Sequence, residues 1–249
     1  MTFFERDPGR KLKPRWQTVS QCDPDSPAAD AIVLTLDIDW ACDEVLADCI
    51  DLVEEAAAPA TWFVTHNTPL LHRLRANDNF ELGIHPNFNP LFEGNGKGAE
   101  QVIDEILAIA PEAVSVRSHS MVQSSRLLEL FRRKGLRFDC NHFIPEQSGI
   151  ILKPWRLWNG MIKVPHFWED DAACIYDAGA AVRDLVRRDG LKVFDFHPIH
   201  VFLNTEDLAR YDQTRGLHDT AIKLVTHRFS GMGTRTQFLD LLAEFKNAQ

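Results

Sequence analysis

The chain has 249 residues, a length that α/β barrels often occupy as one domain. Its formal net charge is -9 and it has no basic stripe, which excludes an extended nucleic-acid surface, so no nucleic-acid partner is expected. Five cysteines without a Cys-x-x-Cys pair indicate neither a disulfide framework nor a thiolate zinc site.

The N-terminus gives no sign of a targeting or membrane segment. Charged residues occur within the first six positions, and nowhere do about 18 apolar residues follow one another. We therefore expect a soluble, cytoplasmic protein without integral membrane contact.

Residues 1–30 are rich in Pro, Asp, Arg and Lys, which predicts an irregular N-terminal segment before a single domain over residues 31–249. Helical patterns cover residues 42–58, 124–135, 180–190 and 238–249. Between them lie seven β-rich runs, at residues 31–39, 60–66, 80–85, 113–119, 137–143, 161–168 and 191–201. This alternation predicts a parallel sheet with right-handed crossovers, and seven strands favour its closure into a barrel.

Polar residues gather on one side of four of these runs. Side chains two positions apart share a face of a strand, so each run can be sorted by side. The series that share a face are Thr35, Asp37 and Asp39; Glu81, Gly83 and His85; Ser115, Arg117 and His119; and Asp195 with His197. Each series ends in an ionisable residue at the carboxyl end of its strand, where barrel enzymes place their sites.

Two carboxylates on one buried face repel each other unless a cation compensates, which points to a divalent metal. Asp39 and His85 have the donor atoms that zinc or a similar ion accepts. Asp37 then stays free to act as a base, with Arg117 paired to it and holding its orientation.

The motif order resembles that of the NodB-type polysaccharide deacetylases, carbohydrate esterase family 4, over about residues 31–245. LTLDIDWA stands where that family has TFDDG, and ATWFVTH is similar to its ATFFV strand. ELGIHPNFN, VSVRSHS and VFDFHPIH occupy the places of its ligand, arginine and late histidine motifs, in a form most like the WbmS-type subgroup. The resemblance implies a distorted (β/α)7 barrel.

Carried over by position, the resemblance makes Asp37 the catalytic base and Asp39 and His85 the metal ligands. Arg117 becomes the residue that orients the base, and His197 the general acid. The implied cofactor is a divalent metal ion, zinc first, with cobalt, nickel or manganese as alternatives.

The chain departs from the family where the second ligating histidine falls on Asn89, since an amide oxygen is a weaker zinc ligand than imidazole. His119, two residues beyond Arg117, is the preferred substitute, and the alternative is that Asn89 caps a turn while His119 lines the groove. His66, at the end of its strand, is the next candidate ligand and is also placed among the substrate-binding residues.

The late motif is ambiguous, because His197 and His200 both lie near a strand end. Strand parity with Asp195 favours His197 as the acid and makes Asp195 its partner, which leaves His200 as a substrate contact. Trp168 follows another strand, where its ring stacks on a sugar face or belongs to an amphipathic strand edge. A backbone N–H near Ser118 to Ser120 is the expected oxyanion donor.

The resemblance implies a metal-dependent deacetylase, a hydrolase of carbon–nitrogen bonds other than peptide bonds. It removes the acetyl or formyl group of an amino sugar, a carbohydrate substrate that is expected to be a surface-polysaccharide precursor. The alternatives are a hydrolase of a small amide or ureide on the same fold and a carbohydrate-binding homologue that lost catalysis. An unrelated lyase or aldolase barrel lacks support, because neither a Schiff-base lysine nor a phosphate-binding glycine loop is evident.

Overall fold

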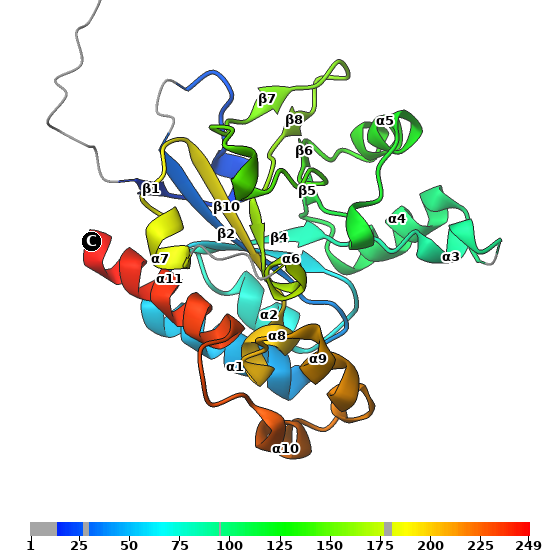
Figure 1. Cartoon of the computed structure of the whole chain (residues 1–249). Helices are drawn as coiled ribbons and strands as arrows, with labels where there is room; N and C mark the ends of the chain where they lie inside the picture. The colour runs from blue at the N-terminus through cyan, green and yellow to red at the C-terminus, as the bar shows by residue number, and fades with distance from the viewer. Residues whose placement is uncertain (1–13, 27–29, 95, 177–180) are drawn as a thin grey trace, which may run out of the picture.

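Figure 1 shows the chain as a computed structural model, in which residues 14–26, 30–94, 96–176 and 181–249 are described. The strands in these ranges are β1 Arg15–Trp16, β2 Ala31–Asp37, β3 Ala60–Val64, β4 Phe80–Ile84, β5 Ser115–Val116, β6 Phe138–Asp139, β7 Trp155–Arg156, β8 Ile162–Lys163, β9 Trp168–Glu169 and β10 Leu191–Phe196. The α-helices are α1 Asp43–Ala56, α2 Leu70–Arg75, α3 Asn89–Phe92, α4 Ala99–Ile109, α5 Ser125–Arg133, α6 Asp170–Tyr176, α7 Val182–Leu185, α8 Pro198–Leu203, α9 Leu208–Thr214, α10 Ala221–Leu224 and α11 Thr234–Ala248.

The strands form one curled sheet in the order β7-β8-β6-β5-β4-β3-β2-β10-β9, with β1 added beside β2. All the paired strands of the described chain run parallel except β7, which is antiparallel to β8. Residues 162–169 contact both ends of the sheet, because β8 pairs with β6 while β9 pairs with β10. The predicted fold class, a distorted α/β barrel of parallel strands, is confirmed.

Each of the seven predicted β-rich runs contains an observed strand. The run at 161–168 differs most from the prediction, because it holds two short strands, β8 and β9, instead of one. Pro165 lies between them, and a proline cannot donate a hydrogen bond to a sheet ladder. The helix predicted over 180–190 is observed only as α7, and Ala180 lies outside the described residues.

The core is built around β2 and β10, in which every residue is buried. Mostly apolar strands that are buried along their whole length are typical of parallel strands covered on both faces. Helices α1, α8 and α11 pack against one another on the outside of these strands (Figure 1). None of the described helices is both long enough and apolar enough to cross a membrane.

Part of the predicted irregular N-terminal segment is ordered against the barrel. The β1 strand pairs in parallel with the start of β2, and the Trp16 ring lies 5.1 Å from that of Phe245. Val19 is fully buried, and its N–H donates to the Thr61 hydroxyl at 3.0 Å. Trp16 and Val19 thus anchor this otherwise polar stretch to the barrel. Residues 1–13 and 27–29 lie outside the described residues.

Gly83 lets three strands approach closely beneath the site. A Cβ atom at this position would lie 2.6 Å from the Phe63 ring and from the Ser115 hydroxyl. The Phe63 ring in turn packs 4.7 Å from the Arg117 guanidinium. Because Gly83 has no side chain, the Phe63 ring can occupy the space next to it and pack against Arg117.

Candidate metal centre and active site

Two carboxylates, Asp37 and Asp39, lie at the end of β2, one positioned by the strand and the other by a turn. Asp37 is the last residue of the strand and shares a face with Thr35, as strand parity predicts. Asp39 lies beyond the strand in a tight turn, where the Ala41 N–H donates to the Ile38 carbonyl at 2.8 Å. The φ angle of Asp39 is 34°, in the left-handed region, so a turn rather than a strand sets its direction.

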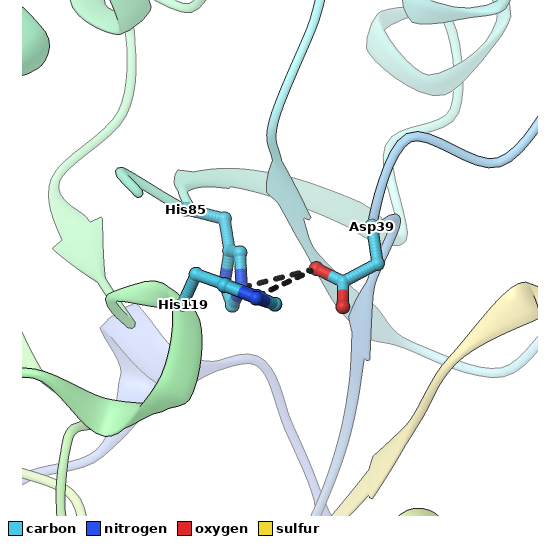
Figure 2. A group of neighbouring side chains, drawn as sticks. All are labelled: Asp39, His85 and His119. Atoms are coloured by element: carbon cyan, nitrogen blue, oxygen red, sulfur yellow. Dashed lines mark hydrogen bonds and ion pairs between the residues drawn. The ribbon is translucent and has the colours of Figure 1, made fainter. Parts of the chain in front are cut away.

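Asp39, His85 and His119 converge at the carboxyl ends of β2, β4 and β5 (Figure 2). His85 Nε2 lies 3.1 Å from Asp39 Oδ1, and His119 Nδ1 lies 3.4 Å from the same oxygen. The two histidine nitrogens are 3.3 Å apart. We call these three residues the rim triad, and the structure thus brings together the three ligands that the sequence favours.

Neighbouring charges shift pKa values in the rim triad. Burial opposes the ionisation of Asp39, but His85 and His119 outweigh it and hold the pKa of this carboxyl well below its usual value. Burial likewise disfavours a charged His85, whereas the Asp37 and Asp39 carboxylates raise its pKa above the ordinary value. The site therefore favours positive charge between its carboxylates.

Buried polar contacts fix the turn that carries His119. The Ser118 N–H donates to Asn141 Oδ1 at 2.6 Å, and Asp139 accepts from the Asn141 side chain at 2.7 Å. The His119 N–H donates to the Pro86 carbonyl at 3.0 Å, next to His85. Two of the three expected oxyanion donors are therefore occupied within the protein, which leaves the Ser120 N–H as the remaining candidate.

Below the rim triad, Arg117 lies between two buried carboxylates. Its Nη1 contacts Asp37 Oδ1 at 3.0 Å and forms a short ion pair with Asp195, and Thr35 Oγ1 accepts from the same nitrogen at 3.0 Å. We call Thr35, Asp37, Arg117 and Asp195 the inner cluster. Burial raises the pKa of Asp195 to about 8, although Arg117 acts in the opposite direction. The predicted Arg117–Asp37 pair is present.

His197 caps the N-terminus of α8, and Asp170 holds its ring. Asp170 Oδ1 lies 2.7 Å from His197 Nδ1, and Asp170 Oδ2 accepts the His197 backbone N–H at 2.8 Å. Burial alone would lower the pKa of His197, but the Asp170 carboxylate outweighs it and raises this pKa well above the usual value. His197 Nε2 then points toward the rim triad, 3.7 Å from Asp39 Oδ2.

Asp170, not Asp195, is therefore the partner of His197. Parity placed Asp195 and His197 on one face, but His197 already leaves the strand as the cap of α8, while Asp195 contacts Arg117. Asp170 was missed as this partner because it lies 27 residues away in sequence. An acidic pair directly after a strand, at the carboxyl edge of the sheet, was the available signal.

The other predicted histidines lie beside the centre. His200 is 5% exposed and sits behind His197, with its Nδ1 3.1 Å from the Thr205 hydroxyl. His66 is half-buried, and its Nδ1 lies 2.8 Å from the Thr65 hydroxyl. Their roles as substrate contacts stay predictions.

Asn89 adjoins the rim triad. Its amide Nδ2 donates to the Ser120 hydroxyl at 3.2 Å, in the turn that carries His119. It also opens the short helix α3, and its N–H donates to Asn87 Oδ1 at 2.9 Å. These contacts are those expected if Asn89 caps a turn. Its alternative role as a metal ligand stays a prediction.

Trp168 is 4% exposed and packs its ring 4.8 Å from that of Phe196. It also lines a pocket of about 520 Å³ with Phe143, Phe167 and Glu169. Its burial leaves an edge of the ring, at most, for a sugar.

The rim triad fits a divalent metal in its atoms and spacing. Zinc bonds to His nitrogen and carboxylate oxygen at about 2.0–2.1 Å, so neighbouring ligands of a tetrahedral ion lie about 3.3–3.4 Å apart. The three separations in the rim triad are 3.1, 3.3 and 3.4 Å. Asp39 Oδ1 is buried and has no hydrogen-bond partner among the described residues, although it faces two imidazoles. A bound cation would satisfy this oxygen, as buried polar groups require.

Comparison with known proteins identifies the family. The family model of the WbmS-like polysaccharide deacetylases matches residues 34–215. The chain belongs to this family. A solved structure from Bordetella bronchiseptica, described as a candidate polysaccharide deacetylase involved in O-antigen biosynthesis, is 47% identical, with a TM-score of 0.89 over 92% of this chain and 97% of that one. The expected family is thus confirmed, and with it a hydrolase of carbon–nitrogen bonds.

More distant structures are also similar in part. A polysaccharide deacetylase candidate from Mycobacterium smegmatis is 15% identical, with a TM-score of 0.43, and covers 85% of this chain and 89% of that one. A 4-α-glucanotransferase from Thermococcus litoralis is 12% identical, with a TM-score of 0.45, over 83% of this chain and 38% of that one. A comparison with curated proteins gives no match.

Proposed function

We propose that this deacetylase uses a divalent metal, zinc first, to hydrolyse the N-acyl group of an amino sugar in a surface-polysaccharide precursor. The convergence of Asp39, His85 and His119, with Asp37 and His197 beside them, is the observation that carries this proposal. The relative involved in O-antigen biosynthesis supports the choice of a surface-polysaccharide precursor.

Asp39, His85 and His119 would hold the metal. When bound, a divalent ion polarises an acyl carbonyl and lowers the pKa of a water molecule. His85 is also oriented from behind, because its Nδ1 lies 3.3 Å from Asp37 Oδ2.

Asp37 is the proposed general base. Its carboxylate takes a proton from the attacking water while the water oxygen forms a bond to the acyl carbon. Arg117 holds Asp37 Oδ1 at 3.0 Å, so the guanidinium fixes the direction of the base and balances its charge.

His197 is the proposed general acid. As the bond between the acyl carbon and the sugar nitrogen breaks, Nε2 gives its proton to that nitrogen, and the products are a carboxylic acid and a free amine. Asp170 holds Nδ1 at 2.7 Å and so keeps Nε2 directed at the rim triad. His197 and Asp37 thus move one proton each, in opposite directions.

The test combines metal analysis with a substrate panel. Purified protein is analysed for bound metal, and the metal-loaded protein is assayed for acid release from N-acetyl and N-formyl amino sugars, free and nucleotide-linked, with allantoin as the rival ureide. We expect about one metal per chain and turnover of an N-acyl sugar. Allantoin turnover alone would favour the ureide hydrolase, and binding of sugar without any metal would favour a degenerate carbohydrate-binding protein.

A further inference from the structure

Trp40 is a large exposed side chain next to the rim triad. It follows Asp39 directly in sequence and is 47% exposed. Its ring centroid lies 5.1 Å from that of His119, with the two ring planes at 78°. An exposed indole thus adjoins two of the three proposed metal ligands.

Trp40 and Asp39 are the two central residues of the turn closed by the Ala41–Ile38 hydrogen bond. This turn holds Trp40 in a backbone conformation that is costly for its residue type. Its φ angle is 55°, in the left-handed region that bulky aromatic residues rarely adopt and that glycine adopts freely. The Thr65 hydroxyl accepts the Trp40 N–H at 3.1 Å and helps to hold this conformation. Strained residues of this kind concentrate at functional sites. A tryptophan that is half-exposed gains little burial in return, so its indole is expected to serve a ligand.

The chemistry of the indole indicates a sugar ring. A pyranose presents an apolar face of C–H groups and keeps its hydroxyls in water, and this face suits a flat aromatic ring that is polar at one edge. The position beside the rim triad suits a sugar whose acyl group reaches the metal ligands while its ring lies against the indole.

The geometry assigns to Trp40 a sugar-binding platform for the pyranose ring that carries the N-acyl group. The identity of the reacting ring rests on the proposed function, whereas the binding of a sugar by the indole does not. Thr65 is then a positioning residue, which acts on the platform through the Trp40 N–H and not on the substrate.

Trp158 supplies a matched control. It is 67% exposed and lies in the turn between β7 and β8, at the amino end of β8. This is the end of the barrel opposite to the carboxyl ends that carry the rim triad.

The first experiment measures binding without turnover. The chain is labelled with 5-fluorotryptophan, and its six tryptophans give separate ¹⁹F NMR signals. Trp40→Phe and Trp158→Phe each remove one signal and so assign it. On titration with N-acetyl-D-glucosamine, the Trp40 signal should shift and saturate while the Trp158 signal stays in place. A Trp40 signal that does not respond overturns the platform.

The second experiment separates binding from chemistry and from folding. Trp40→Gly should raise KM for the N-acyl sugar about tenfold and change kcat far less, since only ring binding is lost. The metal content should stay the same, and the melting temperature should not fall, because glycine relieves the φ strain. Trp40→Phe should recover part of the KM, and Trp158→Gly should not alter it.

The outcomes distinguish this inference from the proposed function. If the wild-type protein turns over an N-acyl sugar and Trp40→Gly keeps its KM, the platform is wrong and the reaction stands. If no sugar is hydrolysed but the Trp40 signal still shifts with the sugar, the platform stands and the reaction is wrong.

Discussion

The inner cluster and the rim triad are adjacent polar groups that balance their charge differently. In the inner cluster, the Arg117 guanidinium lies between the Asp37 and Asp195 carboxylates, so the cation belongs to the chain. In the rim triad, one carboxylate faces two imidazoles, and Asp39 Oδ1 has no hydrogen-bond donor among the described residues. The chain itself supplies a cation to the inner cluster, whereas the rim triad is suited to a cation from outside. The comparison teaches that two adjacent polar groups of one barrel differ in where their compensating positive charge comes from.

The largest effect should come from removing a rim ligand. Asp39→Ala should lose the metal and lower kcat/KM by about 10⁴-fold or more, because the remaining donors no longer enclose an ion. Asp37→Asn should lose comparable activity, since the base is gone, but keep its metal. Elemental analysis beside initial rates checks both variants. If Asp39→Ala kept its metal at the wild-type level, the rim triad would not be the group that binds an external cation.

Removal of the internal cation should lower the stability of the fold, in addition to the activity that depends on the orientation of Asp37. Arg117→Met leaves two buried carboxylates without their partner and should lower the free energy of unfolding by about 3–5 kcal/mol. The double variant Arg117→Met with Asp195→Asn should recover part of this loss, because one of the two charges is then absent. Urea denaturation measures all three proteins. Equal stability of wild type and Arg117→Met would show that the inner cluster is not charge-balanced as described.

Asp170→Asn should change the pH dependence of turnover. Asp170 raises the pKa of His197, and a general acid works only while it is protonated, so wild-type activity should fall as pH rises through this elevated pKa. Without the carboxylate the pKa of His197 drops, and the fall should begin at lower pH, with kcat about 100-fold lower at alkaline pH. Profiles of kcat against pH check this. An unchanged alkaline limb would mean that His197 is not the acid.

The smallest effect should come from substitution of Asn89. This variant tests whether His119 or Asn89 is the third metal ligand. Asn89→Ala should weaken metal binding by less than about tenfold, because the amide only supports the His119 turn. His119→Ala removes a ligand and should weaken it much more. Competition with a chelator measures both affinities, and the reverse order would make Asn89 the ligand.

Strand-based reasoning predicted the residues whose direction a strand sets. The apolar runs of β2 and β10 fixed the sheet, and parity then brought Thr35, Asp37 and Arg117 together. His119, the preferred substitute ligand, lies beside His85, although it is in a turn just beyond β5, and its role as a ligand stays a prediction.

Residues placed by turns and by closure of the barrel were harder to predict. Asp39 and Trp40 lie in a turn with left-handed backbone, where the alternation of side chains along a strand no longer applies. The exposure of the Trp40 indole therefore could not be predicted from strand parity. The Asp170–His197 pair depends on the pairing of β9 with β10, two strands between which α6 and α7 lie in the sequence. The split of one predicted strand at Pro165 is part of the same closure.

The most direct test of the metal centre is X-ray absorption spectroscopy on the zinc-loaded wild-type protein. The account predicts only nitrogen and oxygen neighbours at about 2.0–2.1 Å, with outer scattering from two imidazole rings, and the loss of one ring in His119→Ala. A spectrum with a single imidazole in the wild type, or one that His119→Ala leaves unchanged, would contradict the rim triad as the metal site.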